Sequence, residues 1–222
     1  MAREKEMQHM LEDIVLEVKL TRSYTGYERF SEAVMKAMAA VPRHEFVPPD
    51  MQLFAYANGP LSIGHGQTIS QPYIVALMTE LLNVNDTATV LEIGTGSGYQ
   101  SAVLATLAKQ VYSMEVVEAL GLEARDRLKR MGYHNINTCV GDGYLGWPEH
   151  APYDGIIVTA AAPYIPEPLI EQLKPGARLV IPVGKPFSSQ ELMVVEKGFS
   201  GGVHKRPVLP VAFVPLTHGQ TH

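Results

Sequence analysis

The chain changes character near residue 88, where short apolar runs begin to alternate with stretches of helical periodicity. Strands separated by helices pair in parallel through right-handed crossovers, so this alternation predicts an α/β fold with a doubly wound sheet. The last two runs have only glycine-rich chain between them and are expected to form a hairpin. The predicted strands are residues 89–93, 111–114, 136–140, 155–158, 177–183, 192–196 and 207–214, and the helices are residues 99–108, 117–131 and 168–173. We therefore expect a Rossmann-like, mostly parallel, seven-stranded sheet.

The residues before this sheet favour helices. Residues 5–20 and 28–40 have apolar side chains at helical spacing, whereas residues 41–70 read as irregular. A third helix is expected to run to about Leu82, with Ser70 or Gln71 at its cap and Pro72 in its first turn. The 222 residues suit a single domain, in which residues 1–83 form a helical cap and substrate-side segment and residues 84–222 form a cofactor-binding sheet.

Composition excludes several classes of protein. The formal net charge of −5 argues against a general nucleic-acid binder, which normally carries a basic face. The lone Cys139 cannot form an intramolecular disulfide, and no cluster suggests a bound metal. The amino terminus lacks the apolar run of a signal peptide, and no segment is apolar enough to cross a membrane. We therefore expect a cytoplasmic protein.

A glycine-rich loop, Gly94-Thr-Gly96-Ser-Gly98, follows the first predicted strand and opens a helix. In the dinucleotide fingerprint the third glycine falls one residue later, so this loop suits close approach of a ligand better than a pyrophosphate clamp. Glu115 ends the next strand, 17 residues after Gly98, where a carboxylate can accept both hydroxyls of a ribose. Asp142, after the third strand, is placed to read an adenine amine.

These three elements together resemble the class I S-adenosylmethionine-dependent methyltransferases. That cofactor has no phosphate, and its cationic sulfonium tolerates nearby acids. Alternatively, the glycines serve only tight packing of strand on helix, and Glu115 is a solvated strand end.

The remaining motifs narrow the choice of methyl acceptor. The Asp/Asn-Pro-Pro-aromatic motif of amine-directed nucleic-acid methyltransferases is replaced by residues 158–164, Val-Thr-Ala-Ala-Ala-Pro-Tyr. Cys139 follows threonine rather than the proline of a cytosine-directed nucleophile, so a buried inert thiol is the simpler interpretation. The glycine loop itself does not have the Gly-x-Ser-x-Gly order of the nucleophile elbow of hydrolases.

Six segments closely resemble the protein-L-isoaspartate O-methyltransferase family, and the resemblance runs from about residue 10 to 217. The most specific is Gly-His-Gly-Gln-Thr-Ile-Ser-Gln-Pro at residues 64–72, which lies outside the general methyltransferase core. The others are residues 43–48, 94–100, 153–162, 175–184 and 211–216. The resemblance implies transfer of a methyl group from S-adenosylmethionine to the α-carboxylate of L-isoaspartyl, and some D-aspartyl, residues in damaged proteins. The ester then closes to a succinimide, whose hydrolysis gives some normal aspartate, and the cofactor leaves as S-adenosyl-L-homocysteine.

The resemblance also implies the site residues. Ser70 matches the family's active-site serine, although it could instead serve only as a helix N-cap. The implied cofactor-binding residues are Thr68, Ser70, Glu92, Gly94, Thr95, Gly96, Ser97, Gly98, Glu115, Val116, Asp142 and Gly143. The implied substrate-binding residues are Thr68, Ile69, Ser70, Ala160, Ala161 and Thr217.

Three alternatives stay open. A methyltransferase of the same class could use another acceptor, and a degenerate one could bind the cofactor without turnover. A nicotinamide-dependent oxidoreductase fits less well, because the third glycine comes early and no hydride-transfer constellation is evident. The expected partners are isoaspartyl-containing proteins and peptides rather than nucleic acid or membrane, and the expected state is a monomer.

Overall fold

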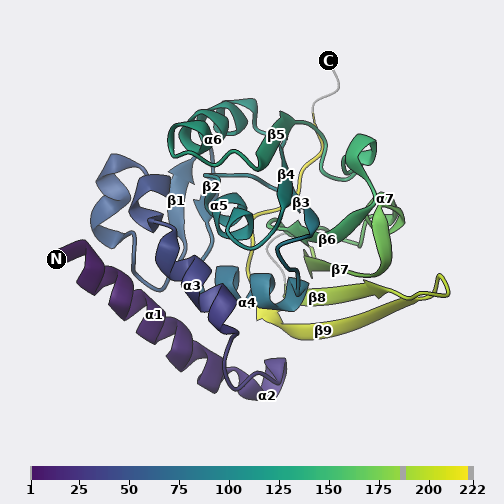
Figure 1. The fold of residues 1–222 in the computed structure, drawn as a ribbon, viewed down its shortest axis with the longest axis horizontal. Helices are drawn as coiled ribbons and strands as arrows, with labels where there is room; N and C mark the ends of the chain where they lie inside the picture. The colour runs from purple at the N-terminus through teal and green to yellow at the C-terminus, as the bar shows by residue number, and fades with distance from the viewer. Residues whose placement is uncertain (1, 186–188, 220–222) are drawn as a thin grey trace.

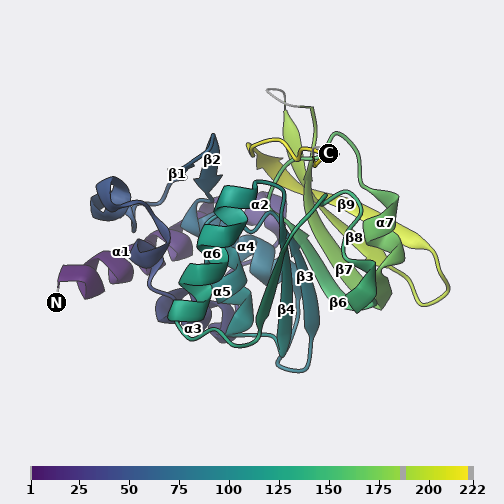
Figure 2. The ribbon, with the colours of Figure 1, turned by 90° about the horizontal axis from the view of Figure 1, so that it is seen from above.

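A twisted sheet of seven strands forms the centre of the molecule (Figures 1 and 2). The structure is a computed structural model that describes residues 2–185 and 189–219. The strand order is β5-β4-β3-β6-β7-β8-β9; the first five strands are parallel, and β8 runs antiparallel to both of its neighbours. The strands are β3 Thr89–Ile93, β4 Gln110–Glu115, β5 Ile136–Val140, β6 Tyr153–Val158, β7 Leu173–Val183, β8 Gln190–Lys197 and β9 Val203–Val211. The predicted Rossmann-like sheet and its terminal hairpin are confirmed.

Helices cover the two faces of the sheet unequally. Helices α4 Pro72–Leu82, α5 Tyr99–Ala105 and α6 Glu118–Arg130 lie on one face, and the short α7 Glu167–Glu171 lies on the other (Figure 2). Successive residues of a strand point to opposite faces, so β3 contributes to two cores. Val90 belongs to the core beneath α4 and α5, whereas Leu91 and Ile93 belong to the core on the other face.

The amino-terminal segment packs as an outer layer beside α4. Helices α1 Ala2–Leu20, α2 Arg22–Thr25 and α3 Glu32–Ala40 lie there, and α1 buries Met10, Ile14 and Val18 (Figure 1). The helix predicted for residues 28–40 begins only at Glu32. Its start is fixed by Ser31, whose hydroxyl accepts a hydrogen bond from the Val34 N–H at 3.3 Å.

Residues 41–70, expected to be irregular, contain regular structure. Two 3₁₀ helices, η1 Arg43–Phe46 and η2 Pro49–Phe54, precede a hairpin of β1 Leu61–Gly64 and β2 Gln67–Ile69. The turn residues Gly64, His65 and Gly66 have φ values of 90°, 51° and 70°. Such short strands give too few alternating positions for a periodic signal, so only the glycines marked the turn.

Other boundaries shift by a few residues. Helix α5 ends three residues before the predicted end at 108, and a last short helix, η3 Pro148–His150, precedes β6. Strand β7 begins at Leu173, inside the helix predicted for residues 168–173. Strand β9 ends at Val211 rather than 214, and residues 212–214 leave the sheet toward the site. Among the described residues, no helix combines the length and apolar character needed to cross a membrane.

Candidate functional site

The glycine loop joins β3 to α5 and takes a conformation that favours glycine. Gly94, Gly96 and Gly98 have φ values of 95°, 53° and 86°. The hydroxyl of Thr159, just after β6, donates to the Gly94 carbonyl at 2.7 Å, and a Cβ on Gly94 would collide with that hydroxyl. The loop is therefore held against the end of the neighbouring strand, leaving its other side free to approach a ligand.

Glu115 stands at the end of β4 and faces the loop. Its Oε2 accepts a hydrogen bond from the Gly96 N–H at 2.7 Å, and its Oε1 accepts from the N–H groups of Val116 and Val117, each at 3.0 Å. The side chain is only 6% exposed. A carboxylate has about four acceptor positions and three are in use, so Glu115 keeps one, on Oε2, for a hydroxyl donor of a ligand.

Glu92 lies beneath the loop rather than in it. Its carboxyl group is fully buried and hydrogen-bonded through Oε2 to the hydroxyls of Ser101 and Ser113, while Oε1 has no partner among the described residues. Burial raises the pKa of Glu92 to about 8, the two serine hydroxyls lower it, and the charge of Glu115 raises it further. Ser113 also shares a hydrogen bond of 2.6 Å with the Thr95 hydroxyl, which links Glu92 to the loop. Glu92 and Thr95 thus support the loop from below.

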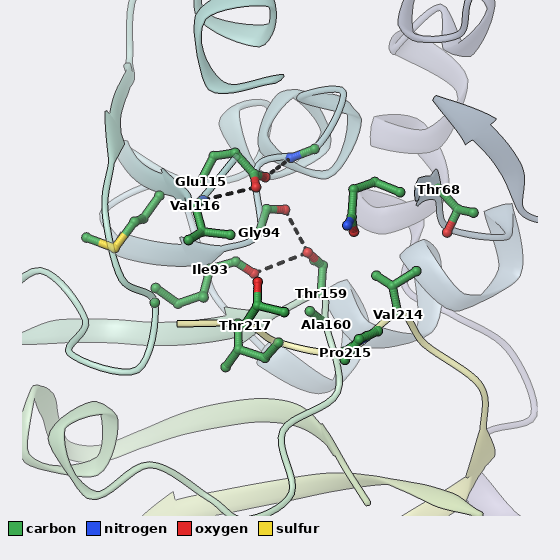
Figure 3. Close-up of a pocket in the computed structure, with 15 residues that line it drawn as sticks. Thr68, Ile93, Gly94, Glu115, Val116, Thr159, Ala160, Val214, Pro215 and Thr217 are labelled. Atoms are coloured by element: carbon green, nitrogen blue, oxygen red, sulfur yellow. Dashed lines mark hydrogen bonds between the residues drawn. The ribbon is translucent and has the colours of Figure 1, made fainter. Parts of the chain in front are cut away.

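A pocket opens above the loop, at the carboxyl ends of β3, β4 and β6 (Figure 3). Eight predicted site residues line it: Thr68, Gly94, Gly96, Glu115, Val116, Gly143, Ala160 and Thr217. Figure 3 shows Thr68 across the pocket from Glu115, because the β1–β2 hairpin brings it there from the amino-terminal segment. Glu115 carries the only charge among the side chains that line this pocket in the described parts of the chain.

Seven further lining residues were not predicted: Gln67, Ile93, Met114, Thr159, Val214, Pro215 and Leu216. Ile93, Met114 and Thr159 lie at or just beyond the ends of parallel strands, and that position was the available signal. The segment after β9 gave no such signal. It reaches the pocket because Ala161 exchanges backbone hydrogen bonds of 2.8 Å with Val214 and Leu216, so Ala161 anchors this segment rather than lining the pocket.

A smaller cavity adjoins the pocket on the side of the hairpin. It is lined by several of the predicted residues, Ile69, Ser70, Thr95 and Ser97, together with Thr68, Gly94 and Gly96 of the main pocket. Thr68 lies in both spaces, so the two halves of the predicted site meet at the hairpin. Gly98 lies in neither lining and serves as the N-cap residue of α5.

Ser70 lies two residues before α4 and is not its cap. Gln71 occupies the N-cap position without a side-chain hydrogen bond, so the hydroxyl of Ser70 is not needed to start the helix. The backbone of Ser70 is fixed instead by Arg43, whose Nη2 donates to the Ser70 carbonyl at 2.7 Å and whose Nε donates to the Ala55 carbonyl at 2.8 Å. Arg43 is completely buried, with its guanidinium 4.8 Å from the centre of the Tyr99 ring. Burial lowers the pKa of Arg43, and Tyr99 opposes this change.

Asp142 lies beside the pocket. Its Oδ1 accepts from the Tyr144 N–H at 2.9 Å, and its Oδ2 lies 2.9 Å from Nδ1 of His218. His218 stacks on the ring of Tyr144 at 4.1 Å. The chain following Thr217 therefore folds over the group expected to read an adenine.

Cys139, interpreted from sequence as a buried thiol, is only half-buried; its burial still raises the pKa of the thiol to about 11, which fits an inert side chain. No group of three or more His, Cys, Asp or Glu side chains within residues 2–185 and 189–219 is arranged to hold a metal ion.

Comparison with known proteins places this chain in a family. The family model described as Protein-L-isoaspartate(D-aspartate) O-methyltransferase matches residues 19–221. A protein-L-isoaspartate O-methyltransferase 2 of Polaromonas sp. is 61% identical over 94% of this chain and 99% of its own length. Another, from Syntrophobacter fumaroxidans, is 57% identical over 95% of this chain and 85% of its own length.

Solved structures agree. A protein-L-isoaspartate O-methyltransferase superposes with a TM-score of 0.80 at 29% identity, covering 96% of this chain; the chain spans 65% of that protein's length. A Plasmodium falciparum protein assigned to the same activity was solved in complex with S-adenosyl-L-homocysteine. It has a TM-score of 0.75 at 24% identity, over 92% of this chain and 97% of its own, and shows the fold.

Proposed function

Because the chain belongs to the protein-L-isoaspartate O-methyltransferase family, we propose that its two adjoining cavities bring S-adenosylmethionine and an isoaspartyl residue together. The enzyme transfers the methyl group to the α-carboxylate of L-isoaspartyl residues in damaged proteins. The methyl ester closes to a succinimide without the enzyme, and hydrolysis returns part of the chain to L-aspartyl. Some D-aspartyl residues are accepted in the same way.

The observation that carries this proposal is the charge of the main pocket. Its lining offers one carboxylate, Glu115, and the described residues that line it include no lysine or arginine. The positive sulfonium of S-adenosylmethionine suits a pocket whose one charge is a carboxylate, whereas the pyrophosphate of a dinucleotide would add negative charge beside Glu115. We assign the ribose to Glu115 and the adenine end to Val116, Asp142 and Gly143.

The cofactor, when bound, supplies an electrophilic methyl group on its sulfonium. The chain has correspondingly little chemistry to perform, because a carboxylate with a pKa near ~4 is already ionised at neutral pH. No general base is required. Catalysis then rests on alignment, with acceptor and methyl held about 3–3.5 Å apart in a site from which water is excluded.

Ser70 is the residue that we assign to the acceptor. Its hydroxyl is not used as a helix cap, and its backbone is held by the buried Arg43. It can therefore donate to an acceptor carboxylate in a fixed direction. Thr68 and Ile69 from the hairpin line the smaller cavity with Ser70, and Ala160 and Thr217 line the adjoining main pocket, which Thr68 shares.

We further assign residues 1–83 to a cap that recognises the substrate and residues 84–222 to the part that binds the cofactor, within one domain. Glu115 and Thr68 face the same pocket from these two parts. We also propose that the protein is a monomer that acts in the cytoplasm on isoaspartyl-containing proteins, and not on nucleic acid or a membrane. The net charge of −5 argues against nucleic acid as a partner.

The test incubates the purified protein with radiolabelled S-adenosylmethionine and two matched peptides, one isoaspartyl and one aspartyl. Base-labile label on the isoaspartyl peptide alone is expected, because only this linkage presents the α-carboxylate as a free side group. Equal labelling of both peptides would indicate another acceptor. Absence of label on both, with the cofactor bound in calorimetry, would indicate a binding module without turnover.

A further inference from the structure

A second and larger cavity, of about 560 Å³, opens beside Ser70 on the side away from the glycine loop. Helix α1 and the start of α4 form one wall, and residues 209–213 at the end of β9 form the other. Thr68 and Ser70 line both this cavity and the methyl-transfer site. A substrate whose isoaspartyl residue reached Ser70 would therefore place the residues beside it in this cavity.

Glu17 of α1 carries the only charge among the described side chains that line this cavity. The Nδ2 of Asn58 lies 3.4 Å from its Oε1, and the Oδ1 of Asn58 accepts from Nε2 of Gln71 at 3.2 Å. These contacts orient the carboxylate beside the residue that follows Ser70. No ion pair joins Glu17 to a basic side chain within residues 2–185 and 189–219.

The opposite wall is apolar and firmly held. Leu209, Val211 and Phe213 line it, and Gln190 fixes Phe213 by accepting its N–H at 2.6 Å and donating to its carbonyl at 3.1 Å. A carboxylate facing an apolar wall suits a side chain with an aliphatic stem and a cationic head. An acidic side chain would meet repulsion from Glu17 and gain nothing from the wall.

We propose that this cavity receives the residues flanking the isoaspartyl residue and that Glu17 selects substrates with a lysine or arginine among them. The inference rests on the proposed function, since it assumes that the isoaspartyl residue reaches Ser70. It makes Glu17 a determinant of substrate choice and leaves the methyl transfer itself to the site already described.

The test uses isoaspartyl peptides that differ only in the flanking residues, with alanine, lysine or glutamate at the two positions on either side. For the wild type, kcat/KM for the best lysine peptide is expected to exceed that of the matching glutamate peptide by about tenfold, since attraction and repulsion both contribute. Glu17→Gln keeps the acceptor for Asn58 but removes the charge, and should reduce this ratio to about threefold or less. Raising the ionic strength should also reduce the wild-type ratio.

The matched control is Glu12→Gln, on the exposed side of α1, which should leave the ratio unchanged. Glu17→Lys should reverse the preference, and circular dichroism establishes whether each variant is folded. A ratio that Glu17→Gln does not alter would overturn the inference while leaving the proposed function intact. Failure of the wild type to methylate even the alanine peptide would instead overturn the proposed function, and the inference with it.

Discussion

Replacing Glu92 by glutamine should change how the stability of the protein depends on pH. The carboxyl group is fully buried, and its Oε1 has no partner among the described residues. Burial raises its pKa from 4.5 to about 8. Between these two values the native state binds more protons than the unfolded chain, so its stability falls as pH rises. The contribution is fully present below pH 4.5 and fully lost above about pH 8.

The magnitude follows from the pKa difference. One unit corresponds to about 1.4 kcal/mol, so the wild type should lose about 2 kcal/mol from this group between about pH 5.5 and about pH 7. Glutamine is neutral at both values and cannot show this loss. Against a total stability of about 5–15 kcal/mol, the difference is large enough to measure.

The assay is urea unfolding of the wild type and Glu92→Gln at these two pH values. As pH rises, the free energy of unfolding of the variant should gain about 2 kcal/mol relative to that of the wild type. The reason is that Glu92 of the wild type stays protonated in the native state but ionises in the unfolded chain, which favours unfolding. Glu123→Gln, on the exposed side of α6, is the matched control and should follow the wild type. Parallel curves for the wild type and Glu92→Gln would refute a raised pKa for this group.

Three further changes test the site. Ser70→Ala should lower kcat by about 10²-fold with little change in melting temperature, because Gln71 and not Ser70 is the N-cap residue of α4. Equal loss of stability and turnover would show that the role of Ser70 is structural. Glu115→Ala should raise the Kd for S-adenosylhomocysteine about 30-fold in calorimetry, through loss of one charge-assisted hydrogen bond worth about 2 kcal/mol, and an unchanged Kd would contradict the assignment to the ribose. Arg43→Lys keeps the charge, but lysine cannot donate to the carbonyls of Ala55 and Ser70 at once, so the free energy of unfolding should fall by about 3 kcal/mol. A variant as stable as the wild type would argue against the hydrogen bond that holds the Ser70 backbone.

The part of the site that follows from sequence is the part built on the ends of parallel strands. Glu115 and the glycine loop could be placed together because β3 and β4 are adjacent and parallel, so their carboxyl ends meet at one edge. The position of Thr159 follows from the same rule, applied to β6.

The rest depends on contacts between segments distant in the chain. The hairpin that carries Thr68 is too short for periodicity to reveal, and it reaches the pocket only through tertiary packing. Residues 214–217 were predicted partly as strand, yet they leave β9 and pair with Ala161. Only Thr217 of these was expected in the site, and only from resemblance to a family.

The strand order also bears on how the molecule folds. Strands β7, β8 and β9 are joined in sequence by hairpins, so their contacts are local and closing them costs little chain entropy. By contrast, β3 pairs with β6 across more than 60 residues, shown by the Thr89 N–H that donates to Asp154. Non-local pairings of this kind are slow to form. The pocket lies where β3 meets β6 and where the segment after β9 returns. Methyl transfer during refolding should therefore recover only after β3 has paired with β6.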